Sequence, residues 1–101
     1  MDNKAEIALD YIPLPTILNK NTYTYVLYQK GIRATIYEQW SEDKLIAYEV
    51  FKKKVSREKV FKGFVFPARE KFPRNEDFGY SAWTYKNKYN ALKKFNEIEG
   101  V

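Results

Sequence analysis

The chain lacks cysteine and histidine, and its 101 residues include only four glycines and four prolines. Without cysteine, the chain has no disulfide framework and no thiolate chemistry. Zinc and copper lose their usual ligands, and the common acid–base catalyst near neutral pH is missing as well. We therefore expect a protein that is not an enzyme and that uses no cofactor and no metal.

Long apolar runs are also absent. No stretch approaches the roughly 18 consecutive apolar residues of a transmembrane helix. The mixed-charge start, Met1–Glu6, is not followed by the apolar run of a signal peptide. These features predict a cytoplasmic protein without membrane association.

Charge is distributed unevenly around a net value of +5. Residues 1–50 carry five basic and seven acidic side chains, whereas residues 51–101 carry thirteen basic and six acidic ones. Any surface that attracts polyanions is therefore expected from the second half of the chain.

Aromatic residues make up 18% of the chain, and several segments have strand composition. Residues 22–28 are dense in β-formers, and both 32–37 and 45–53 alternate in polarity as half-buried strands do. Short connections between them favour an antiparallel meander. A fourth strand at 60–66, a loop at 67–79 and a fifth strand at 80–84 complete the predicted sheet region, 22–84.

A helix is predicted over 86–98, because Tyr85, Tyr89, Leu92 and Ile98 recur at helical spacing. Thr84 is the expected N-cap, and Gly100 stands where helices commonly end. A short helix at 3–10 would end before the prolines of an N-terminal arm, 1–20.

Together these elements predict one α+β domain over residues 1–101. Its antiparallel meander has three to five strands, and the C-terminal helix packs on one face of the sheet. The other face must be covered by loops, by the N-terminal arm or by a partner, which leaves a homodimer open.

The basic stretch of the second half is the first candidate site. Lysines and arginines could contact phosphates, and the phenylalanines among them could stack on bases, although most of these rings are expected in the core. The alternative is a solvated strand end whose lysines prevent edge-to-edge aggregation. The predicted nucleic-acid contacts are Lys52, Lys53, Lys54, Arg57, Lys59, Lys62, Lys86 and Lys93.

Aromatic residues of the first two strands form the second candidate site. Tyrosine is enriched at protein interfaces because it buries area and keeps a polar tip, but it is also simply a good strand former. The predicted interface residues are Tyr23, Tyr25, Tyr28, Tyr37 and Trp40.

Carboxylate chemistry has weaker support. The triplet Glu42–Lys44 has the acid-x-Lys form found in metal-dependent nucleases, which need a second acidic ligand on a neighbouring strand. Asp10 and Glu38 are the nearby choices, and neither has a recognisable setting. The triplet also has ordinary turn composition, which we favour.

Two segments carry a resemblance. Phe72–Tyr85, followed by the helix with Ala91 and Phe95, resembles small uncharacterised proteins of bacteriophages and mobile elements of gut bacteria, and Leu45–Phe51 is similar to the same group. The resemblance implies a setting in which short proteins bind or inhibit host machinery, including defence systems.

These observations lead to two functional hypotheses. The first is a small binding module, an accessory protein of a phage or mobile element, that binds nucleic acid or a nucleoprotein through its basic, aromatic second half. The alternative is an inhibitor or adaptor that binds a host protein through a tyrosine-rich sheet face or edge.

Overall fold

The computed structural model describes residues 10–101, and its contacts divide the chain into two compact units. The sheet unit comprises Pro15–Lys53 and Phe72–Val101, and the hairpin unit comprises Met1–Leu14 and Lys54–Lys71. The helix expected at 3–10 lies outside the described residues except for Asp10, which is in a bend. The single domain over 1–101 stays a prediction.

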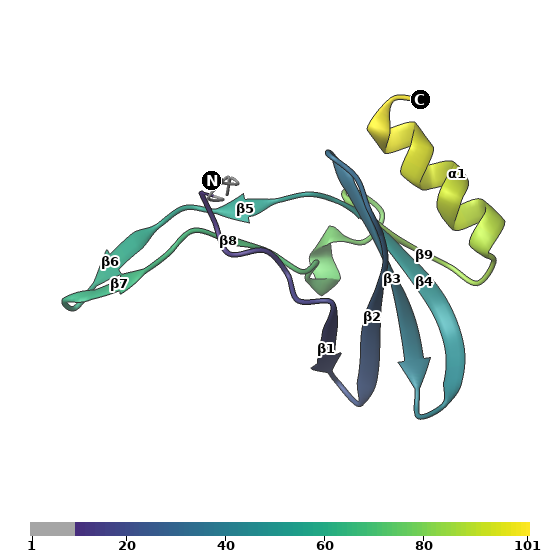
Figure 1. Ribbon diagram of the computed structural model, residues 1–101, viewed down its shortest axis with the longest axis horizontal. Helices are drawn as coiled ribbons and strands as arrows, with labels where there is room; N and C mark the ends of the chain where they lie inside the picture. The colour runs from purple at the N-terminus through teal and green to yellow at the C-terminus, as the bar shows by residue number, and fades with distance from the viewer. Residues whose placement is uncertain (1–9) are drawn as a thin grey trace, which may run out of the picture. The chain divides into compact units, whose positions relative to one another are not determined.

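Five antiparallel strands form the sheet of the sheet unit, in the spatial order β1-β2-β3-β4-β9 (Figure 1). Its first four strands follow one another along the chain, and one helix follows the last strand, which confirms the predicted α+β meander. The strands are β1 (Ile17–Lys20), β2 (Tyr23–Lys30), β3 (Ala34–Ser41), β4 (Lys44–Lys52) and β9 (Ala82–Tyr85).

The strands predicted at 22–28, 45–53 and 80–84 are found within two residues of these bounds, and two other differences from the prediction lie nearby. The N-terminal arm contributes β1, because Asn21 and Thr22 adopt positive φ angles of 54° and 70° and reverse the chain into β2. The next strand begins at Ala34 and not at Ile32, which is exposed in the turn. Gly31 closes this turn by donating its N–H to the Ala34 carbonyl at 2.8 Å.

The helix α1 spans Lys88–Glu99. Its N-cap is Asn87, whose side chain accepts the N–H of Asn90 at 3.2 Å, so the expected cap at Thr84 is wrong and that residue lies in β9. Gly100 ends the helix as predicted, in the left-handed region with φ of 88°.

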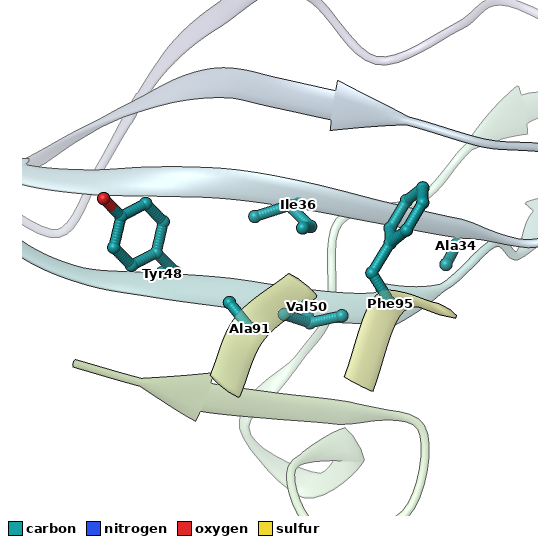
Figure 2. Close-up of a cluster of buried hydrophobic side chains, with 6 residues drawn as sticks. All are labelled: Ala34, Ile36, Tyr48, Val50, Ala91 and Phe95. Atoms are coloured by element: carbon teal, nitrogen blue, oxygen red, sulfur yellow. The ribbon is translucent and has the colours of Figure 1, made fainter. Parts of the chain in front are cut away.

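The helix covers one face of the sheet through a cluster of small, branched and aromatic side chains. Ala91 and Phe95 point from α1 onto β3 and β4, as Figure 2 shows. The expected packing face of the helix is wrong at Tyr89, which is 73% exposed. The buried cluster consists of Ala34, Ile36, Tyr48, Val50, Ala91 and Phe95.

The opposite face of the sheet is covered by the segment that follows Lys71. The ring of Phe72 lies 4.9 Å from that of Tyr25 and 5.4 Å from those of Tyr37 and Phe51, measured between ring centroids. Lys20 Nζ lies over the same ring and donates to the Pro73 carbonyl at 3.3 Å. A loop therefore covers the middle of this face, which removes the reason for expecting a homodimer there.

The hairpin unit replaces two predicted elements. The strand expected at 60–66 is a hairpin of β6 (Lys59–Phe61) and β7 (Phe64–Phe66), because Lys62 and Gly63 turn the chain. The loop expected at 67–79 contains the strand β8 (Arg69–Glu70), which pairs with β5 (Val55–Ser56). Within the sheet unit, that loop also contains the 3-10 turn η1 (Asn75–Asp77).

Candidate nucleic-acid interface

The hairpin β6–β7 is built on a tight two-residue turn. Lys62 and Gly63 have φ angles of 52° and 81°, and the residues flanking them, Phe61 and Phe64, are paired. Two consecutive positive φ angles are the signature of a type I′ turn, whose twist matches that of antiparallel strands. The turn therefore fixes which side chains of the two strands lie opposite each other.

Pairing places three phenylalanines on one face of the hairpin. Phe61 pairs with Phe64, and Lys59 pairs with Phe66, whereas Val60 pairs with Val65. Side chains directly opposite each other share a face, and successive residues alternate between faces. We call the face that carries Lys59, Phe61, Phe64 and Phe66 the aromatic face. The two valines occupy the other face.

The rings of the aromatic face are in solvent. Phe61 is 62% exposed, Phe64 69% and Phe66 50%. The expectation that most phenylalanines of this stretch lie in the core is therefore wrong for these three, although it holds for Phe51. Exposed apolar side chains that gather on one face are typical of interaction surfaces.

Basic side chains lie beside the aromatic face at Phe61 and Phe66. Lys62 Nζ lies 5.5 Å from the centroid of the Phe61 ring, within cation–π range. A groove of about 490 Å³ lies in the same unit, between the base of the hairpin and the residues that flank it. It is lined by Ile12, Ser56, Arg57, Lys59, Val60, Phe61, Phe66, Pro67 and Arg69.

Backbone contacts hold the base of the hairpin. Ile12 donates its N–H to the Ala68 carbonyl at 3.0 Å and accepts the N–H of Glu70 at 2.8 Å. The side chain of Glu70 is buried and accepts the Leu14 N–H at 3.0 Å, while Ser56 Oγ donates to the Arg69 carbonyl at 3.2 Å. This framework brings Arg57 and Arg69 to one groove.

The predicted basic residues divide between the two units. Lys54, Arg57, Lys59 and Lys62 belong to the hairpin unit. The sequence prediction missed Arg69, because its approach to the groove depends on the β5–β8 pairing, which has no local sequence signal. The remaining four predicted residues belong to the sheet unit: Lys52, Lys53, Lys86 and Lys93.

Basic side chains are densest in residues 54–71 of the hairpin unit. This segment carries six basic and two acidic side chains, whereas residues 1–14 of the same unit carry one and three, and the sheet unit carries eleven and eight. In the sheet unit, Lys93 and Lys52 line two hollows beside α1, of about 250 and 320 Å³. Both hollows also contain Glu97, which pairs with Lys94 at 3.0 Å and reduces their positive potential.

The predicted tyrosine interface is divided by burial. Tyr37 is fully buried and Tyr25 is 5% exposed, because both rings pack beneath Phe72. Tyr23 and Trp40 are half-buried, and the Trp40 Nε1 donates to Glu38 at 3.0 Å. Tyr28 is exposed and contacts Tyr48 edge-on. The two buried tyrosines therefore cannot present a docking surface.

One buried carboxyl group lies beneath the covered face. Burial raises the pKa of Glu49 to about 7, against the opposing charge of Lys20. Burial and then the charge of Glu49 raise the pKa of Tyr25. Within residues 10–101, no hydrogen-bond partner is present for Glu49 Oε1.

The triplet Glu42–Lys44, which has the acid-x-Lys form of metal-dependent nucleases, lies at a turn. Glu42 and Asp43 form the exposed turn between β3 and β4.

Across the described part of the chain, no three acidic side chains gather as a metal site, and no helix has the length and apolarity to cross a membrane. Comparisons with protein-family models, with curated proteins and with solved structures find no match. Function is therefore inferred from the fold and the aromatic face.

Proposed function

We propose that this protein is a small, non-enzymatic binding module that binds nucleic acid, alone or within a nucleoprotein, through its hairpin unit. One observation carries the proposal: three exposed phenylalanines share one face of a hairpin with Lys59, beside a groove that Arg57 and Arg69 line, and Lys62 Nζ lies over the Phe61 ring. Exposed rings among cations provide stacking surfaces and phosphate contacts together.

Electrostatics makes the proposal testable by salt. Each phosphate that a protein neutralises releases condensed counterions, so affinity falls steeply as salt rises. Labelled DNA and RNA oligonucleotides would be titrated with the full chain over a series of salt concentrations, with fluorescence anisotropy as the readout. We expect log Kd to rise linearly with log salt. Absence of binding at low salt, or affinity that salt does not change, would contradict the proposal.

A pair of variants with equal charge locates the site. The triple variant Arg57→Gln/Lys59→Gln/Lys62→Gln and the control Lys86→Gln/Lys88→Gln/Lys93→Gln each remove three positive charges. The hairpin variant should lose affinity on the order of tenfold or more, and its salt slope should fall by about 0.7 to 0.9 per lost phosphate contact. Equal losses in both variants would show that net charge and not the hairpin drives binding.

The second candidate, an inhibitor or adaptor of phage origin that binds a host protein, has support from a different observation. Of the sheet strands in the described residues, β1 is an edge strand, and its Ile17 is 59% exposed. Edge strands can pair with another chain. A host protein that is retained after nuclease treatment and released by Ile17→Lys would favour this candidate over nucleic-acid binding.

A further inference from the structure

The aromatic face has a geometry that distinguishes single strands from duplexes, and the inference drawn from it rests on the proposed function. Phe64 and Phe66 stand two residues apart on β7 and share the face. A strand rises about 3.4 Å per residue, so these rings are about 6.8 Å apart along the strand. Bases in B-form DNA are about 3.4 Å apart along each strand. Bases stacked on successive rings must therefore be spread to twice the duplex spacing.

The chemistry of the face agrees with this geometry. A duplex buries the π-faces of its bases in the stack and presents their edges, which proteins read with hydrogen-bonding side chains. Between residues 59 and 66 the polar side chains are Lys59 and Lys62, and the others are valines, phenylalanines and one glycine. Such a surface has little capacity to read base edges, whereas phenylalanine rings can stack on the π-face of any unpaired base.

The groove supplies a place for the backbone of the same strand. Its volume of about 490 Å³ lies within the ~300–1,000 Å³ range of small-ligand sites. Phe61 and Phe66 line it together with Arg57, Lys59 and Arg69. A base stacked on either ring thus has cations within the same groove for its phosphate.

We infer that the aromatic face binds single-stranded nucleic acid, with unpaired bases on Phe61, Phe64 and Phe66 and phosphates at Arg57, Lys59 and Arg69. Ring stacking of this kind is tolerant of sequence, so the preference is for strandedness. The cations set the salt dependence, and the rings set the selectivity for unpaired bases.

The full chain would be titrated at one salt concentration with a labelled 12-nucleotide single strand and with the same strand annealed to its complement. We expect the single strand to bind on the order of tenfold more tightly. Phe61→Leu/Phe66→Leu keeps apolar bulk but removes the π-faces. It should lower single-strand affinity about tenfold, with an unchanged salt slope and unchanged duplex affinity.

Two further variants separate stacking from folding. Phe61→Trp/Phe66→Trp should restore single-strand affinity, because tryptophan also stacks. Val65→Ala, on the other face of the hairpin and outside the groove lining, should leave single-strand affinity within about twofold of the unmodified protein.

The outcomes distinguish this inference from the proposed function. Salt-dependent binding with equal affinity for both forms, or equal losses for both forms in the leucine variant, would overturn the single-strand inference and leave nucleic-acid binding in place. Binding to neither form would overturn both. Binding to vesicles of anionic phosphatidylserine, with no affinity for oligonucleotides, would also overturn both and would identify a lipid surface instead.

Discussion

Glu99, in the last turn of α1, is joined to Arg33 in the turn between β2 and β3. Its Oε2 accepts the Arg33 backbone N–H at 2.7 Å, and Arg33 Nη1 returns a 3.4 Å bond to the Glu99 carbonyl. The same carboxylate accepts the N–H groups of Ile32 and Ala34 at 3.2 and 2.7 Å. A β-carbon at Gly31 would collide with this carboxylate and with the Phe95 ring, so a larger residue there would displace the Glu99 side chain from the turn. The Glu99 side chain therefore connects the end of the helix to the turn between β2 and β3.

Replacing Glu99 with glutamine should destabilise the sheet unit at neutral pH. Burial alone would raise the pKa of Glu99, but the bonds from Arg33, Ala34 and Ile32 and the charge of Arg33 outweigh it and lower the pKa below 4.5. A lowered pKa stabilises the fold above pH 4.5, and this contribution is lost as pH falls through the folded-state value. The unfolding midpoint of Glu99→Gln should thus lie below that of the unmodified protein at pH 7, with a difference that narrows below pH 4.5.

A matched control lies in the same turn of the helix. Glu97 is exposed and pairs with Lys94 on the surface, so Glu97→Gln should have a much smaller effect on the melting temperature at pH 7. If the two variants melt alike at pH 7, the interaction of Glu99 with the turn does not contribute to stability.

Phe72 packs the loop that follows Lys71 against the sheet face opposite α1, and Phe72→Ala should be strongly destabilising. Removal of a core phenylalanine costs ~3–5 kcal/mol, and the half-buried Phe72 is expected at the lower end, about 3 kcal/mol. Urea unfolding followed by tryptophan fluorescence measures this loss, since Trp40 and Trp83 both belong to the sheet unit. The same substitution at the exposed Phe64 should cost less than about 0.5 kcal/mol. Similar losses at both positions would contradict the packing role of Phe72.

Much of the sheet unit could be predicted from the sequence because its signals are local. Alternation in β4 correctly separates Tyr48 and Val50, beneath the helix, from Glu49 and Phe51 on the other face. Helical spacing and Gly100 located α1 to within two residues at its start and one at its end. The packing face of α1 was missed at Tyr89, because its neighbours in space come from strands distant in sequence.

The candidate site was harder to predict, because its form depends on one turn. The run from Val60 to Phe66 has the composition of a single buried strand, and sequence alone does not show that Lys62 adopts a positive φ. Once the chain reverses at Lys62 and Gly63, the phenylalanines have no layer to pack against within the two-stranded hairpin. The contribution of Arg69 likewise depends on pairing across thirteen residues with Ser56.

The turn itself can be tested through Gly63→Ala. The φ of 81° is strained for alanine, and no atom lies within 4 Å of the added β-carbon, so the cost is conformational and amounts to about 1 kcal/mol. Amide hydrogen exchange in β6 and β7 should therefore become about fivefold faster. Gly79→Ala introduces the same kind of strain at φ of 94° in the sheet unit and should leave exchange in the hairpin unchanged. Unchanged exchange in Gly63→Ala would argue against the two-residue turn.

The raised pKa of Glu49 predicts that the protein loses stability as pH rises towards neutrality. Its pKa is raised from 4.5 to about 7 by burial, so the folded state binds a proton more tightly than the unfolded chain. Below pH 4.5 Glu49 is protonated in both states and does not lower the free energy of unfolding. Between about pH 4.5 and 7 the unfolded chain loses this proton more readily than the folded state, so the free energy of unfolding declines. A shift of this size corresponds to roughly 3 kcal/mol. Lys20, whose charge opposes the shift, and Tyr25 are the titratable neighbours.

Glu49→Gln removes the ionisation while keeping the size of the side chain, so it should abolish most of this decline. Urea unfolding at pH 5 and pH 8 would compare the variant with the unmodified protein and with Glu42→Gln, which alters an exposed turn residue. We expect Glu49→Gln to gain stability relative to the unmodified protein at pH 8 and to gain less at pH 5, while Glu42→Gln follows the unmodified protein at both values. A constant difference between Glu49→Gln and the unmodified protein across this range would show that Glu49 does not titrate with a raised pKa in the folded state.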